Sequence, residues 1–258
     1  MTEATGETER WAGLAAIPGL PTTRASAGHE DRARELQELA RDAHAYLGDA
    51  LGTAFSPTVV VAAPDDWADN EDGAPYGIPY ASETELVVVI PATAADNPLV
   101  DTYAQVASRE DAARFADLIA VHELGHLHVR ETGLDLPLGW LGELTATYLS
   151  YCFLAAHRPA DAALWVRVSR DHAAAVTPAY RSLEDLDGIY FDVGPENYIW
   201  YQDTLTAMVE EVHAERGPAF VLRLRDAGLT PASDTATTLA AAEAIHPGFE
   251  RWAATLRR

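Results

Sequence analysis

A short stretch at residues 120–128 constrains this 258-residue chain more than any other part of it. It contains His122, Glu123 and His126 in the pattern H-E-x-x-H. Apolar residues upstream share one helical stripe with both histidines, which predicts a helix whose imidazoles continue a core-facing side. The stripe consists of Phe115, Leu118, Ile119, His122 and His126.

The ends of this helix also carry sequence signals. Ser108 followed by Asp111 is typical of a capping box at a helix start, and Gly133 is a natural stop after the last turn. Two histidines four residues apart present their rings to a single metal ion. Glu123, offset by about 100° around the helix, can reach a water near that ion without being a ligand.

A catalytic zinc site needs three protein ligands and one open position, so a third ligand decides whether the motif is functional. The continuation H-x-x-G-x-x-H is excluded, because Val129 and Thr132 stand where it requires glycine and histidine. Glu143 is the only charged residue in the apolar segment 138–156, which reads as a buried helix. A lone buried carboxylate costs several kcal/mol unless a cation or hydrogen bonds compensate it, and Zn²⁺ would be that cation.

Two other interpretations stay open in the sequence. Glu143 could be a partly exposed residue near the first turn of its helix, where the helix dipole favours an acidic side chain. The two histidines could be satisfied core residues beside a surface Glu123. A transmembrane reading of residues 138–156 fails, because the segment contains one Glu, two Gly, two Thr and a Ser.

Together, H-E-L-G-H at residues 122–126 and W-L-G-E-L-T-A-T-Y at residues 140–148 resemble the gluzincin metallopeptidases. The nearest branch is the aminopeptidase-N-like one, whose pattern is H-E-x-x-H followed by W-L-N-E-G-F-A-x-Y. The spacer here is shorter, and Gly142 replaces the asparagine before the ligand glutamate. Thr147 stands where thermolysin-like relatives have an aspartate, so the groups that orient the histidines stay unassigned.

The resemblance also implies a tyrosine that hydrogen-bonds the oxyanion, some 55 to 60 residues after the ligand glutamate. Tyr201 matches that tyrosine best, with Tyr198 as the alternative. An apolar helical stripe running from Tyr201 to Val212 supports a plain core role for Tyr201 instead.

The resemblance implies a zinc-dependent hydrolase that attacks a peptide or amide carbonyl, with His122, His126 and Glu143 as ligands and Glu123 as general base. The Gly-x-Met-x-Asn motif that holds a free amino terminus in the family is absent, since methionine occurs only at two positions. The alternatives are a zinc-dependent biosynthetic or tailoring enzyme on a non-peptide substrate, and a catalytically silent binding module.

The amino-acid composition limits the classes of binding partner and the cellular compartment that we expect. The net charge of −22 argues against nucleic acid and anionic membranes as partners, because both would repel the chain. The expected partner is therefore a peptide or small amide substrate, and the oligomeric state is open. The first thirty residues show no signal-peptide pattern, so we expect a cytoplasmic protein.

The predicted fold class is α+β and zincin-like: a small N-terminal α/β lobe ends in the motif helix, and a mainly helical lobe follows. We expect a loosely ordered lead-in at residues 1–27, the first lobe at 28–134 and the helical lobe at 135–258, with Asp135–Pro137 as the hinge. The expected elements of the first lobe are a helix at His29–Leu47 and strands at Pro57–Ala63 and Glu85–Pro91. By resemblance, Glu85–Pro91 is the candidate to pair with substrate backbone. Further helices are expected at Ala160–Ala175, Tyr198–Arg216, Pro218–Ala227 and from Asp234 onward.

Overall fold

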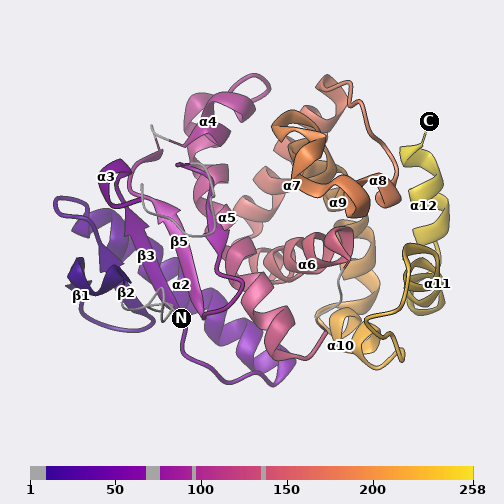
Figure 1. The fold of residues 1–258 in the computed structure, drawn as a ribbon, viewed down its shortest axis with the longest axis horizontal. Coiled ribbons are helices and arrows are strands. Elements are labelled where there is room, and N and C mark those ends of the chain that lie inside the picture. The colour runs from indigo at the N-terminus through magenta and orange to yellow at the C-terminus, as the bar shows by residue number, and fades with distance from the viewer. Residues whose placement is uncertain (1–9, 68–75, 95–96, 135–137, 258) are drawn as a thin grey trace, which may run out of the picture. The chain divides into compact units, whose positions relative to one another are not determined.

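A computed structural model shows an α+β protein that is mostly helical and contains a mixed five-stranded sheet (Figure 1). It describes residues 10–67, 76–94, 97–134 and 138–257. The chain forms two compact units, residues 1–46 with 54–127 and residues 47–53 with 128–258. We expect the boundary between the lobes after residue 134, with a hinge at Asp135–Pro137. Residues 135–137 lie outside the described residues.

The first unit contains the sheet and most of the motif helix, whose last residues, 128–131, belong to the second unit. Its strands run in the order β1-β2-β3-β5-β4, with β2, β3 and β5 parallel and both outer strands antiparallel to their neighbours. The elements are η1 (Trp11–Gly13), β1 (Ala15–Ile17), β2 (Thr22–Ala25), α2 (Glu30–Leu51), β3 (Thr58–Ala62), α3 (Pro64–Trp67), β4 (Tyr80–Ala81), β5 (Val87–Pro91), α4 (Pro98–Tyr103) and α5 (Arg109–Glu131).

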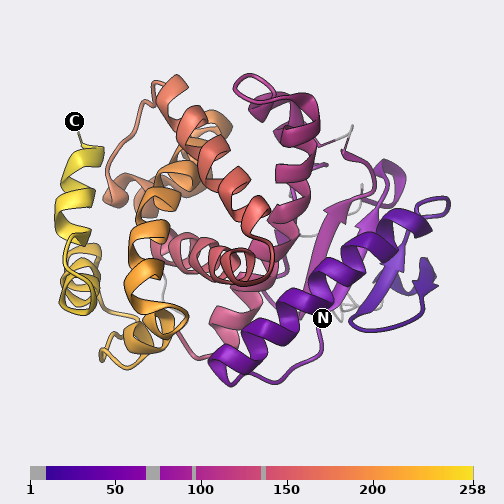
Figure 2. The same cartoon turned by 180° about the vertical axis from the view of Figure 1, so that it is seen from behind.

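The central strands are apolar on both sides because both faces of the sheet are covered. Val60 of β3 is in register with Val89 of β5, and both belong to a buried cluster around Trp11 and Trp67. Successive side chains of a strand alternate between the two faces of the sheet. Val59 therefore points to the face opposite the one that Val60 faces. Helix α2 runs across a face of the sheet (Figure 2).

The position of β5 corrects one expectation. Strand β4 pairs with β5 through Tyr80↔Val89 and Ala81↔Val88, while β3 pairs with β5 on its other side. The backbone of β5 at these positions is therefore already paired within the sheet. The expectation that this strand pairs with substrate backbone is wrong at Val88 and Val89, because β4 takes that place.

The motif helix α5 begins and ends where its capping signals predict. The backbone N–H of Asp111 donates a hydrogen bond of 3.0 Å to Oγ of Ser108. Gly133 follows the last turn with φ +80°, a backbone conformation that glycine adopts without strain. The Ser108 cap and the Gly133 stop are confirmed.

Residues 15–25 form two strands inside the stretch that we expect to be a lead-in. Strand β1 pairs with β2 antiparallel, and β2 continues the sheet by pairing with β3 in parallel. These strands are three and four residues long with mixed burial, so their alternation is too short to show in the sequence.

The second unit is helical. Its elements are α6 (Gly139–His157), α7 (Pro159–Ala175), α8 (Leu183–Ile189), η3 (Tyr190–Val193), α9 (Pro195–Arg216), α10 (Ala219–Arg225), α11 (Thr235–Ile245) and α12 (Phe249–Leu256). Helix α6 packs against α7, α8 and α9, which accounts for a sequence that is apolar nearly all round. The expected last helix is two helices, because Pro247 and Gly248, with φ +129° at Gly248, separate α11 from α12.

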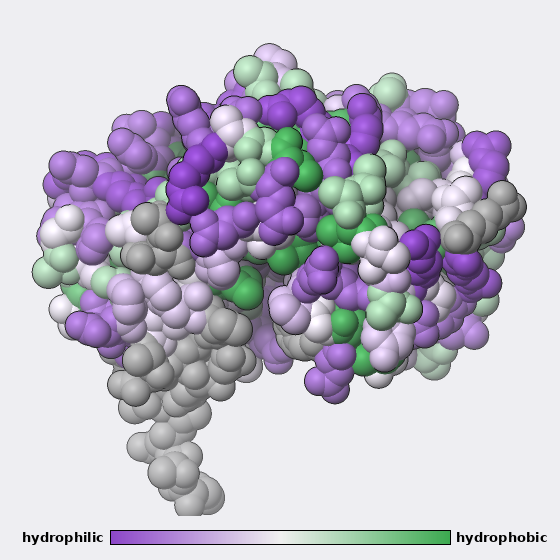
Figure 3. Space-filling view, turned by 90° about the horizontal axis from the view of Figure 1, so that it is seen from above, coloured by the Kyte–Doolittle hydropathy of each residue, from purple (hydrophilic) through white to green (hydrophobic). Residues whose placement is uncertain are grey.

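The surface is mainly hydrophilic on the face that is seen from above in Figure 3. Among the described residues, the large hydrophobic side chains that are exposed are Leu20 and Tyr180. No helix in the described part of the chain is long and apolar enough to cross a membrane.

The core of the helical unit can be tested with a pair of leucine truncations. Leu149 in α6 is fully buried, whereas the side chain of Leu20 is 73% exposed. We expect Leu149→Ala to lower the free energy of unfolding by about 2–5 kcal/mol, because it removes buried methyl groups and leaves a cavity. Urea denaturation should show little change for Leu20→Ala, and equal losses in the two variants would contradict this packing.

Candidate metal centre

Helix α5 brings the two motif histidines together on one face. His122 and His126 are one turn apart, and their Nε2 atoms lie 3.0 Å from each other. The ring centroids are 4.7 Å apart and the ring planes are nearly perpendicular, at 87°. Both imidazoles therefore direct the same nitrogen toward a common point, which is the arrangement that two ligands of one metal ion require.

Helix α6 supplies the carboxylate. Glu143 lies in the second turn of this helix and its exposed fraction is 3%. The interpretation of Glu143 as a partly exposed residue held by the helix dipole is therefore wrong. A carboxylate this deeply buried needs a compensating cation or several hydrogen bonds.

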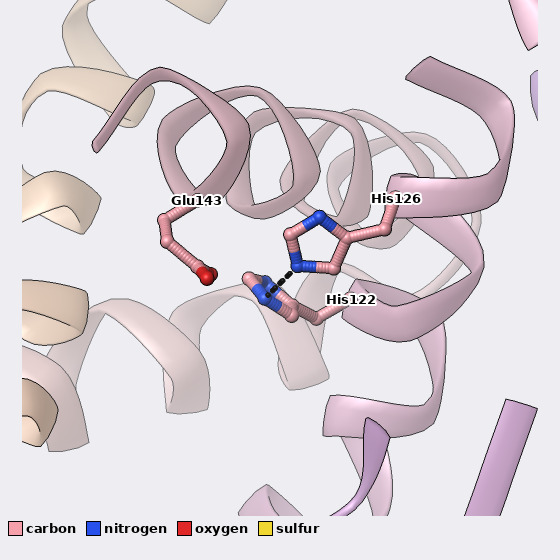
Figure 4. Close-up of side chains that lie close together, drawn as sticks. All are labelled: His122, His126 and Glu143. Atoms are coloured by element: carbon pink, nitrogen blue, oxygen red, sulfur yellow. Dashed lines mark hydrogen bonds between the residues drawn. The ribbon is translucent and has the colours of Figure 1, made fainter. Parts of the chain in front are cut away.

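The three side chains converge. Figure 4 shows the carboxylate of Glu143 directed toward the imidazoles of His122 and His126. Each residue offers one ligand atom, and these atoms all lie within 4.8 Å of one another. Among the described residues this is the group of three or more His, Cys, Asp or Glu side chains that could hold a metal ion.

The donor set fits zinc. Two neutral imidazoles and one carboxylate form a His₂Glu ligand set, which leaves a tetrahedral Zn²⁺ one open position and a net positive charge. Two ligands about 2.0–2.1 Å from a tetrahedral zinc lie roughly 3.3 Å apart, so the 3.0 Å between the Nε2 atoms is close to the required spacing. One positive ion would satisfy both nitrogen lone pairs and the buried carboxylate at once.

Glu123 is buried beside one of the candidate ligands in the sequence. It directly follows His122 on α5 and its side chain is 7% exposed, so the alternative of a surface Glu123 is wrong. The residue is not one of the three convergent ligands. It lies about 100° from His122 around the helix.

The two candidate tyrosines have different partners. The hydroxyl of Tyr198 donates a hydrogen bond of 2.9 Å to Oε1 of Glu143. The hydroxyl of Tyr201 donates one of 2.8 Å to the backbone carbonyl of Ser182. The structure therefore brings Tyr198 to the candidate ligand Glu143, and it places Tyr201, which the sequence favours, in the core.

Burial keeps the phenol of Tyr201 protonated. Its side chain is fully buried, and this desolvation, with Asp185 and Glu184 nearby, raises the pKa of the phenol above its usual range. Tyr201 remains a neutral hydrogen-bond donor to a main-chain carbonyl. Tyr198 and Tyr201 are three residues apart and share one side of α9, so helical spacing alone does not separate them.

His128 lies about 160° from His126 around α5, and this angular position predicts a side chain exposed to solvent. The side chain is instead fully buried, and its Nδ1 lies 2.7 Å from Oγ1 of Thr53. The expectation of an exposed His128 is wrong because the segment after α2 covers it. His128 is not among the convergent metal ligands.

No protein family, curated protein or solved structure matches this chain. The resemblance to gluzincins is therefore supported by the motif residues alone. The candidate metal site is supported by the geometry of His122, His126 and Glu143.

Zinc binding tests the centre directly. We expect the purified chain to bind about one Zn²⁺, because three donor groups converge on one point. His122→Ala should remove most of this binding, as it deletes one of three ligands. His157→Ala is the matched control, since His157 is an exposed histidine at the end of α6. Atomic emission analysis after dialysis against a weak chelator gives the stoichiometry; equal zinc content in the two variants would exclude His122 as a ligand.

Proposed function

We propose that this protein is a zinc-dependent hydrolase of the gluzincin type that cleaves a peptide bond or a related amide bond. The observation that supports the proposal most is the convergence of His122, His126 and Glu143, with the buried Glu123 next to the first of them. A structural zinc site is normally closed by four protein ligands, whereas three leave a position open for reaction.

The chemistry follows from what each side chain can do. When bound, zinc supplies a Lewis acid that polarises a carbonyl and makes a water more acidic. Glu123 accepts a proton from the water as the water oxygen attacks the carbonyl carbon. The same carboxyl then delivers this proton to the leaving nitrogen as the C–N bond breaks, which yields a carboxylic acid and an amine.

Tyr198 is the group best placed to assist at the carbonyl oxygen. Its hydroxyl lies 2.9 Å from a ligand carboxylate oxygen, so it is a donor beside the position where the metal would be held. A neutral phenol can turn its O–H from the carboxylate toward a developing oxyanion. One donor of this kind contributes about 3 kcal/mol in the transition state.

The role of Glu123 can be separated from metal binding. We expect Glu123→Gln to keep zinc at the wild-type stoichiometry, because Glu123 is not a ligand. Turnover should fall by about 10²–10⁴-fold, because the amide cannot accept the water proton. Release of amines from a peptide library measures turnover. Wild-type turnover in the variant would remove Glu123 from the mechanism.

The same library also tests the substrate class. A wild-type chain that binds zinc but cleaves no member of the library would favour the alternative of a tailoring enzyme on a non-peptide substrate. A wild-type chain that binds no zinc would contradict the proposed hydrolase altogether.

The two tyrosines provide a matched pair of variants. Tyr198→Phe should lower kcat by about 10²-fold with zinc retained, since it removes one donor near the reacting oxygen. Tyr201→Phe should leave kcat nearly unchanged and lower the free energy of unfolding by about 1 kcal/mol, because it leaves the carbonyl of Ser182 without that donor. Steady-state kinetics and urea denaturation give both quantities; a larger loss of kcat in Tyr201→Phe would reverse the assignment.

A further inference from the structure

Residues 180–187 make contacts with the first turns of two helices that carry site residues. This segment, which we call the bracket, runs from Tyr180 into helix α8. One of its ends contacts the start of α6, the helix of Glu143, and the other contacts the start of α9, the helix of Tyr198. All of these contacts lie within the helical unit.

Asp187 holds the start of α6. Its Oδ1 accepts a hydrogen bond of 3.2 Å from the backbone N–H of Trp140, and its Oδ2 accepts one of 2.5 Å from the hydroxyl of Thr235. Oγ1 of Thr235 in turn accepts a hydrogen bond of 3.1 Å from the indole N–H of Trp140. Trp140 is thus fixed through its backbone and its side chain by one closed set of hydrogen bonds.

This contact replaces a missing cap. Leu138, the N-cap residue of α6, has no side chain that can accept a hydrogen bond from the helix, so Asp187 satisfies a free N–H from outside it. A negative charge at a helix start is also favoured by the helix dipole. Burial raises the pKa of Asp187, while the hydrogen bonds from Thr235 and from the Trp140 backbone act in the opposite direction.

Asn197 holds the start of α9 in a similar way. Its Oδ1 accepts a hydrogen bond of 2.8 Å from the backbone N–H of Tyr180, and its Nδ2 donates one of 3.0 Å to the carbonyl of the same residue. Tyr201 also donates to the carbonyl of Ser182, but it lies in the next turn of α9, beyond the turn that carries Tyr198. Asn197 directly precedes Tyr198, so the bracket fixes the turn from which the Tyr198 side chain extends.

We propose that the bracket sets the contact between Glu143 and Tyr198, with Asp187 as the positioning residue for Glu143 and Asn197 as the positioning residue for Tyr198. The proposal rests on the proposed function, because it assigns these residues to the same centre. Glu143 lies one helical turn after Trp140, so a shift or fraying of the first turn of α6 moves its carboxylate directly. Displacements near 1 Å are enough to impair metal binding or catalysis.

The two halves of the bracket predict different defects. Asp187→Ala should weaken zinc binding by about tenfold, measured by competition with a chromogenic chelator, because it loosens the turn that carries a ligand. Asn197→Ala should leave zinc affinity unchanged and lower kcat by about tenfold with little effect on KM, because it loosens only the turn of Tyr198.

The chain offers a matched control and a conservative rescue. Asp185 lies in the same segment and caps α8 itself through Ser182, without a hydrogen bond to α6. Asp185→Ala should therefore keep wild-type zinc affinity. Asp187→Asn should restore most of it, because the amide oxygen still accepts from Trp140. If Asp187→Ala does not fold, Thr235→Val removes one hydroxyl from the same set of bonds and should weaken zinc binding in the same direction.

A measurement without metal completes the test. Hydrogen exchange in residues 138–148 of the metal-free protein should be about tenfold faster in Asp187→Ala and unchanged in Asp185→Ala. Unchanged exchange together with wild-type zinc affinity in Asp187→Ala would overturn the bracket while leaving the hydrolase intact. Equal weakening in Asp185→Ala would also overturn it, because the effect would then come from general loss of α8. A wild-type chain without zinc binding would overturn both proposals.

Discussion

The structure of the helical unit depends on the burial of one carboxylate. Glu143 is the single charged side chain of a helix that three other helices surround, and it is almost inaccessible to solvent. A protein keeps such a group only where nearby donors or a cation compensate the lost hydration. The hydroxyl of Tyr198 supplies one donor, and the imidazoles of His122 and His126 lie where a shared cation would supply the remainder.

Several hydrogen bonds near Glu143 and Tyr198 are made at helix starts. Pro195 opens α9 at a position where its missing N–H has no cost, and Asn197 ties the same turn to the chain before α8. Asp187 accepts a hydrogen bond from the first turn of α6. Tyr198 lies in the first turn of α9 and Glu143 directly follows the first turn of α6, and in such first turns the backbone has free groups through which neighbouring segments can hold it.

Much of the centre follows from the sequence, because helical periodicity and lone buried charges are local signals. The spacing of His122 and His126, the cap at Ser108 and the isolation of Glu143 in an apolar segment all required no tertiary information. The choice between Tyr198 and Tyr201 did require it, since the two differ only in which neighbour their hydroxyls meet. The short strands β1, β2 and β4 also escaped prediction, because two to four residues give too little alternation to indicate a strand.

The pairing of β4 with β5 has a consequence for what the protein can recognise. A two-residue strand at the margin of a sheet offers few backbone donors and acceptors, so a long extended chain gains little by adding to it. For the proposed hydrolase, affinity for such a ligand would have to come from side-chain contacts. A compact molecule with a single amide group would give up no backbone pairing by comparison.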